Sequence, residues 1–186
     1  MMKRRILSAF QLTLLFLLFV SALAEGKETA LVGEWVCRDE TKITVITLNE
    51  NGSAVYGGLA LSWQNADGAL LLTDGTGETI RIIYEETENG LTAWLPTRFT
   101  RISEIGKGGE ITGTWKADGK SDSSFVFTED GRFLEDGVFT GSFVQDSESG
   151  KITLKYVMGM FEDTVIYYSF DGDAMVISYP WQLVRK

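Results

Sequence analysis

The chain has 186 residues, a formal net charge of −9, no histidine and one cysteine, Cys37. Without histidine it has no Ser-His or Cys-His nucleophile pair, no imidazole acid–base chemistry and none of the usual histidine zinc ligands. An acidic surface repels phosphate backbones and anionic lipid headgroups, so we expect no nucleic acid partner and no membrane association of the processed chain. A single cysteine forms no internal disulfide, and we expect Cys37 to be a small buried residue rather than a reactive thiol.

The first 24 residues have the pattern of an export signal. Three basic residues (Lys3, Arg4 and Arg5) precede a mostly apolar run at 6–20, and Ala22-Leu23-Ala24 offers the small-x-small pattern of a signal peptidase site. We therefore predict a signal peptide over 1–24, with the rest of the chain secreted or extracytoplasmic. The alternative is an uncleaved N-terminal membrane anchor, because the apolar run could just span a bilayer. Cleavage would remove three positive charges and change the net charge from −9 to −12.

Two short patterns occur twice along the chain. Gly33-Glu34-Trp35 returns as Gly113-Thr114-Trp115, and Pro96…Arg101 returns as Pro180…Arg185. The chain has only two prolines, and both the prolines and these arginines lie 84 positions apart. Rare residues at matched places indicate an internal duplication. We predict a first repeat over 31–102, a linker over 103–110 that contains Gly106, Gly108 and Gly109, and a second repeat over 111–186.

The pattern between these landmarks is that of antiparallel β-structure. Short apolar or alternating runs are separated by Asx-Gly pairs, the strongest local signal for a β-hairpin. No stretch after the signal shows a sustained 3.6-residue apolar period, so we predict an all-β fold with little helix. The Asx-Gly pairs are Asn51-Gly52, Asp67-Gly68, Asp74-Gly75, Asn89-Gly90, Asp118-Gly119, Asp130-Gly131, Asp136-Gly137 and Asp171-Gly172.

A G-x-W on the first strand, a β-meander and an arginine after the last strand resemble the lipocalin (calycin) pattern. Each copy is similar to the short lipocalin-like domains of exported bacterial proteins. The resemblance implies two tandem antiparallel barrels, each closed by a tryptophan under an arginine: Arg101 on Trp35, and Arg185 on Trp115. Each copy is about half a lipocalin's length and has no counterpart of the family's middle motif, so we expect a small lumen filled by side chains. The alternative is one larger barrel or sandwich built from both repeats. The expected structural residues are Gly33, Trp35, Arg101, Gly113, Trp115 and Arg185.

The carboxylates suit solvent better than catalysis. Glu85, Glu86, Glu88, Glu129 and Asp130 lie at or beside hairpin turns, and Asp171-Gly172-Asp173 does not follow a calcium-binding ladder. We therefore expect no enzyme activity, no metal and no cofactor. Trp63, Trp94 and Trp181 are interpreted as core or barrel-rim residues rather than a sugar platform.

One loop of the second repeat suggests a contact site. The first repeat has the polar turn Thr76–Thr79 where the second has Met158-Gly159-Met160-Phe161, and methionine-rich tips are adaptable contact surfaces. The alternative is that Met158, Met160 and Phe161 fold inward as a lid. The lipocalin resemblance implies an exported, non-enzymatic binding module that holds a small apolar ligand or a protein partner at a barrel mouth. The competing function is a structural or interaction domain of the cell envelope, with filled barrels and no ligand.

Overall fold

A computed structural model describes residues 30–103, 110–119, 122–159 and 161–186. The predicted signal peptide, most of the predicted linker and Met160 lie outside the described residues. The elements within the described part are fourteen β-strands. They are β1 (Gly33–Cys37), β2 (Glu40–Leu48), β3 (Ser53–Tyr56), β4 (Leu59–Ala66), β5 (Ala69–Thr73), β6 (Thr79–Thr87), β7 (Gly90–Arg101), β8 (Gly113–Ala117), β9 (Ser124–Phe127), β10 (Arg132–Glu135), β11 (Phe139–Asp146), β12 (Lys151–Tyr156), β13 (Thr164–Asp171) and β14 (Ala174–Arg185).

All fourteen strands form one antiparallel sheet that closes on itself in a ring. Each strand pairs with the next along the chain, and β14 returns to pair with β1. The all-β prediction is confirmed. The eight Asx-Gly pairs all fall between consecutive strands or at their first or last residues, so the local hairpin signals were read correctly.

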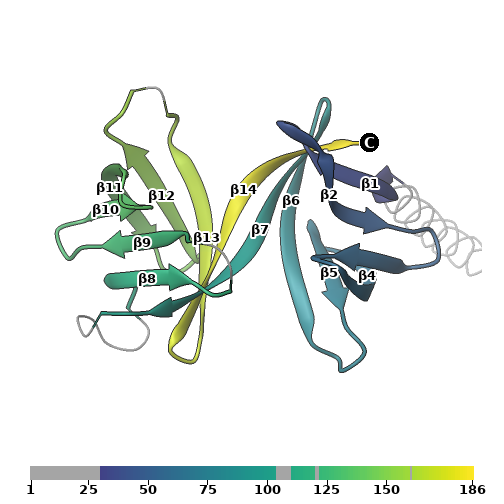
Figure 1. Ribbon diagram of the computed structural model, residues 1–186, viewed down its shortest axis with the longest axis horizontal. Helices are drawn as coiled ribbons and strands as arrows, with labels where there is room; N and C mark the ends of the chain where they lie inside the picture. Colours follow the sequence, from purple (N-terminus) through teal and green to yellow (C-terminus); the bar gives the residue numbers. More distant parts are fainter. Residues whose placement is uncertain (1–29, 104–109, 120–121, 160) are drawn as a thin grey trace, which may run out of the picture.

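The two longest strands cross the middle of the ring. β7 and β14 pair with each other from Leu91 opposite Leu183 to Thr100 opposite Ala174. This β7–β14 ribbon divides the ring into two circuits: β1 to β7 close through β14, and β8 to β14 close through β7. Figure 1 shows the resulting two lobes on either side of the diagonal ribbon, β1 to β6 in the first and β8 to β13 in the second.

Each lobe has its own packed core, and each core includes a residue from the part of the chain that forms most of the other lobe. Leu183 of β14 is fully buried among the first-lobe residues, while Phe99 of β7 packs into the core of the second lobe. The second core is rich in aromatic rings, with Trp115, Phe125, Phe127 and Phe133 fully buried. Large side chains therefore fill both interiors, as expected for circuits this small.

The ends of the two circuits are closed by tryptophan and arginine, but in the opposite combination from the one expected. The Arg101 guanidinium lies 4.4 Å from the centre of the Trp115 ring, and the Arg185 guanidinium lies 5.2 Å from that of Trp35. The expectation that Arg101 covers Trp35 and Arg185 covers Trp115 is wrong. Arg101 is the last residue of β7, and this end of β7 pairs with β8, so that Arg101 lies opposite Trp115. Arg185 is the last residue of β14, and this end of β14 pairs with β1, so that Arg185 lies opposite Trp35.

The glycine of the G-x-W pattern makes room for this closure. Gly33 has a φ of +142°, a conformation that residues with a side chain avoid, and a Cβ there would lie 3.4 Å from Arg185 Nε. Gly113 has the matching φ of +136°. The indole N–H groups find equivalent partners: Trp35 Nε1 donates to Leu31 O at 2.8 Å, and Trp115 Nε1 donates to Ile111 O at 2.7 Å. The six residues singled out from the sequence thus all lie at the two closures.

Cys37 differs from its expected placement. It is half-buried, and not on the buried face with Trp35. The β1–β2 register shifts on both sides of Val36, and this bulge buries Val36 while it turns Cys37 outward. The matching strand β8 keeps a regular alternation, with Trp115 and Ala117 both buried.

Candidate functional site

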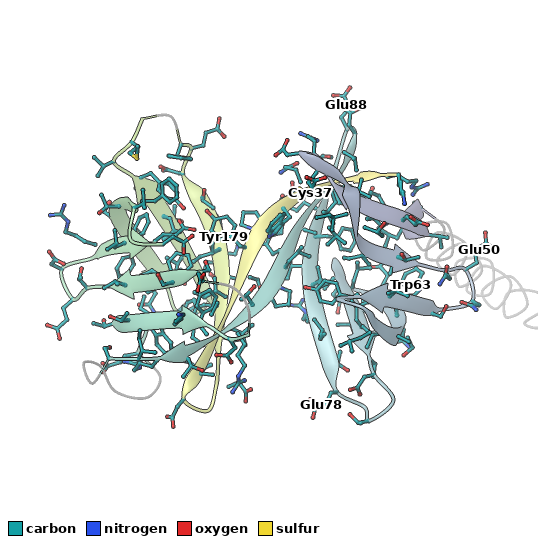
Figure 2. All side chains as sticks on the ribbon, viewed as in Figure 1. Cys37, Glu50, Trp63, Glu78, Glu88 and Tyr179 are labelled. Carbon is teal, nitrogen blue, oxygen red and sulfur yellow. The ribbon has the colours of Figure 1, made fainter. Side chains whose placement is uncertain are left out.

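An apolar groove of about 970 Å³ lies beside the first lobe. Its walls come from β1, β2, β3 and the β7–β14 ribbon. Ile43 is 62% exposed on this surface. Trp181 is 44% exposed, whereas each of the other four tryptophans is at most 7% exposed. Figure 2 shows Cys37 at the place where β1 approaches the ribbon. The lining residues are Glu34, Cys37, Glu40, Ile43, Thr44, Val45, Thr47, Val55, Tyr56, Gly57, Gly58, Leu95 and Trp181. We call this the apolar groove.

The charged groups of the apolar groove are acidic. Glu34 and Glu40 line it, and none of its described lining residues is lysine or arginine. Lys186 Nζ lies 2.9 Å from Glu34 Oε2 and holds the pKa of that carboxyl below its usual range. Burial raises the pKa of the Tyr56 hydroxyl, so Tyr56 stays neutral at physiological pH. The groove therefore favours neutral apolar groups over anionic ones.

A smaller pocket of about 260 Å³ opens beside the second lobe, and Trp181 lines it too. Glu135, at the end of β10, is half-buried at this pocket. Its Oε2 accepts a hydrogen bond of 2.6 Å from the Tyr156 hydroxyl, which lies 2.8 Å from the Tyr179 hydroxyl. Desolvation by burial raises the pKa of Glu135, and the hydrogen bond from Tyr156 offsets this only in part. We call this the Glu135 pocket; Figure 2 shows Tyr179 on the side of the ribbon toward the second lobe.

The opposite face of the ribbon contributes to a cleft of about 650 Å³ between the lobes. Trp94 bridges the lobes on this face: its Nε1 donates to Val165 O at 2.8 Å, and its ring packs edge-on against Tyr167 with centroids 5.5 Å apart. Arg98 bonds to both Asp118 and Asp171. These contacts are structural, because they satisfy the polar groups they involve and join the two lobes.

Met158 and Phe161 lie at the tip between β12 and β13, and each is 41% exposed. Phe161 packs its ring against Phe139 and Tyr156, with centroids 5.2 and 5.4 Å apart. Neither Met158 nor Phe161 lines the apolar groove or the Glu135 pocket. Their binding role stays a prediction, and Met160 lies outside the described residues.

Of the carboxylates expected at or beside turns, Glu88, Glu129 and Asp130 lie between strands, whereas Glu85 and Glu86 lie within β6; all five are exposed. Figure 2 shows Glu88, Glu78 and Glu50 at strand ends, pointing away from the body of the protein. Among the described residues, no three His, Cys, Asp or Glu side chains gather in a way that could hold a metal ion. The described part of the chain also contains no helix long and apolar enough to cross a membrane. Trp63 is buried in the first core, Trp94 is buried between the lobes and belongs to neither core, and Trp181 is an exposed rim residue of the apolar groove.

The sequence interpretation missed most of the residues that line the two hollows. Ile43 and Val55 are exposed apolar residues on β2 and β3, and alternation gave no reason to single them out. Glu135 is a carboxylate at the end of an apolar strand, and its position has an equivalent in the first lobe. Glu135 pairs with Phe125 in the second lobe, and Tyr56 pairs with Ile46 in the first. The two residues thus hold equivalent positions in their lobes, and a comparison of the two predicted repeats at that position would have found the difference.

Comparison of the chain with protein-family models, with curated proteins and with solved structures finds no match. The fold alone defines the class of protein: an all-β chain whose single antiparallel sheet closes in a ring.

Proposed function

We propose that this protein is an exported, non-enzymatic binding module that holds a small, neutral apolar ligand in the apolar groove. The observation that carries the proposal is the groove itself, about 970 Å³ of space lined by Ile43, Val45, Val55, Leu95 and Trp181. Small-molecule sites have volumes of about 300–1,000 Å³ and mostly apolar walls. The export pattern at residues 1–24 supports the extracytoplasmic location.

We further propose that the lobes are tandem repeats of a lipocalin-like plan that exchange their closing strands. An offset of 84 residues relates Arg101 to Arg185, and the same offset relates Leu95 to Tyr179, which face each other in the ribbon. A pseudo-two-fold axis through this pair exchanges β7 with β14. Duplication followed by reciprocal pairing of the two last strands accounts for this symmetry. The ligand then binds beside the first lobe and not inside a lumen, because side chains fill both interiors.

The choice of a neutral ligand follows from the charges of the groove. A fatty acid or another anion would meet Glu40 and the Glu34–Lys186 ion pair, and no described lining residue supplies a cation to pair with it. Uncompensated burial of a charge costs more than apolar contacts of this size return. A protein partner would need a flatter and larger surface than this groove provides.

The test uses the full chain without residues 1–24 and a neutral fluorescent probe, N-phenyl-1-naphthylamine. Val55 lines the groove and Val144 lies on β11 away from it, and both are exposed strand valines. Val55→Asp should weaken probe binding by about tenfold or more, because the ligand would then bury a carboxylate, whereas Val144→Asp should leave it unchanged. Equal affinities for the two variants would reject the groove as the site.

The filled interiors also favour the second function, a structural or interaction domain of the envelope. Trp115, Phe125, Phe127 and Phe133 leave no lumen in the second lobe. Wild-type protein that binds no neutral apolar probe, and that shows no co-purified small molecule in native mass spectrometry, would favour this function over the binding module.

A further inference from the structure

The Glu135 pocket combines a carboxylate with aromatic walls. Phe99 and Phe125 are buried, with their rings edge-on and centroids 5.7 Å apart. Tyr179 and Trp181 of β14 add two further aromatic side chains. The full lining is Thr97, Phe99, Ser123, Phe125, Glu135, Ile177, Tyr179 and Trp181.

The hydrogen bonds at Glu135 orient its carboxylate without neutralising it. The Tyr156 hydroxyl has one proton, and it donates that proton to Glu135 Oε2, so the Tyr179 hydroxyl must donate to Tyr156. Both tyrosines are neutral donors. Among the described residues, no lysine or arginine forms an ion pair with Glu135. The carboxylate thus stands half-buried and fixed in place, with a formal charge that its described neighbours do not balance.

The chemistry of such a pocket selects one class of ligand. A half-buried carboxylate attracts a cation, and aromatic faces attract organic cations through their ring quadrupoles. A metal ion would find too few ligands, because Glu135 belongs to no described cluster of three metal-binding side chains. At about 260 Å³ the pocket is small, so the cation must be compact. We propose that the Glu135 pocket binds a small organic ammonium ion, with Glu135 as its counter-ion and Phe125, Tyr179 and Trp181 as its walls.

The first lobe provides an internal comparison. Tyr56 occupies the place of Glu135, and Leu95 occupies the place of Tyr179. The equivalent rim in the first lobe therefore opens onto the apolar groove. The ammonium site is built on Glu135 and Tyr179, which the first lobe lacks, and it shares only Trp181 with the apolar groove.

The experiment compares choline with 3,3-dimethyl-1-butanol, which has the same shape but no charge. Binding to the chain without residues 1–24 is measured at pH 8 by titration calorimetry and by intrinsic tryptophan fluorescence, to which Trp181, the most exposed of the five tryptophans, should contribute most of the change. We expect choline to bind about tenfold or more tightly than the alcohol, because only the ammonium gains from the carboxylate and the rings. Equal binding of the two, or no choline binding at millimolar concentration, would overturn the proposal.

The variants assign the effect to one carboxylate. Glu135→Gln keeps the size of the side chain and should weaken choline binding by about tenfold or more. The matched control, Glu129→Gln, removes the same charge from the exposed turn before β10 and should bind choline as the wild type does. Choline binding by Glu135→Gln at wild-type affinity would also overturn the proposal. Thermal melts establish that both variants are folded, and retention of N-phenyl-1-naphthylamine by Glu135→Gln separates this site from the apolar groove.

Discussion

A tryptophan and an arginine close one end of each circuit: Trp35 with Arg185, and Trp115 with Arg101. Each indole is buried, donates a hydrogen bond to a backbone oxygen four residues earlier, and lies under an arginine. Trp35 and Arg185 are 150 positions apart in the sequence, yet they pair directly across β1 and β14. The stability of the first lobe therefore depends on the last residues of the chain.

A double-mutant cycle tests this exchange of partners. Trp35→Ala and Trp115→Ala should each cost about 3–5 kcal/mol of unfolding free energy, the range for large aromatic truncations in cores. The coupling between Trp35 and Arg185 should be about 0.5–1 kcal/mol, and so should that between Trp115 and Arg101. The crossed pair, Trp35 with Arg101, should show no coupling in urea unfolding experiments. Coupling in the crossed pair alone would contradict the observed arrangement.

Glu135 makes the unfolding free energy depend on pH. Its pKa in the folded protein is raised, so the folded state binds a proton more tightly than the unfolded state does. The resulting stabilisation is fully present below the unfolded pKa and is lost as the pH rises through the folded pKa. Asp136, Tyr156 and Tyr179 are the titratable groups that influence Glu135. In urea melts, Glu135→Gln should therefore gain stability relative to the wild type between pH 4 and pH 8, whereas a constant difference would contradict the raised pKa.

The element that sets the architecture is the β7–β14 ribbon. Both cores lie on one face of it, since Leu91, Ala93 and Leu183 serve the first core and Phe99, Met175 and Ile177 serve the second. The other face holds Trp94 and Arg98, which contact the second lobe. A long twisted ribbon can close two circuits because its ends pair with different strands: the C-terminal end of β14 pairs with β1, and the C-terminal end of β7 pairs with β8.

Gly90 tests the close approach within the ribbon. A Cβ at Gly90 would collide with the backbone oxygen of Leu183, and a backbone oxygen cannot rotate away. Gly90→Ala should therefore cost about 1–3 kcal/mol, as overpacking does. Gly75→Ala is the matched control, because a Cβ at that turn meets nothing within 4 Å. Equal melting temperatures for the two variants would show that β14 can move aside without cost.

Particular residues show what the sequence could and could not predict. Asx-Gly pairs located the hairpins, because each acts through its own turn and needs no distant partner. The sequence could not assign the tryptophan partners of Arg101 and Arg185, because the two arginines end similar strands and either one could cover either tryptophan. Cys37 was misplaced because its outward position depends on a bulge in β1 that no local pattern announces. The Glu135 pocket escaped notice because its walls come from β7, β9, β10 and β14, and the β7–β14 pairing that brings them together is not local.

At the scale of the whole molecule, the two lobes depend on each other. A cut in the predicted linker would leave residues 30–103 without Leu183 and Arg185, and residues 110–186 without Phe99 and Arg101. We expect neither fragment to unfold cooperatively in urea alone, and we expect the co-expressed fragments to associate and unfold as one unit. A single fragment with a cooperative transition of its own would show that one lobe closes without the exchanged strand.

The pairing of β1 with β14 also sets the order in which the two lobes can close during synthesis. β1 is synthesised early, yet its edge partner is β14, which is synthesised after all the other described strands. Until Leu183 and Arg185 emerge, the hydrogen-bonding edge of β1 and one side of the first core stay exposed, and exposed strand edges recruit other chains. The lobe that emerges first is therefore the one that closes last. A chain interrupted before Leu183 would present an open β-sheet edge at β1.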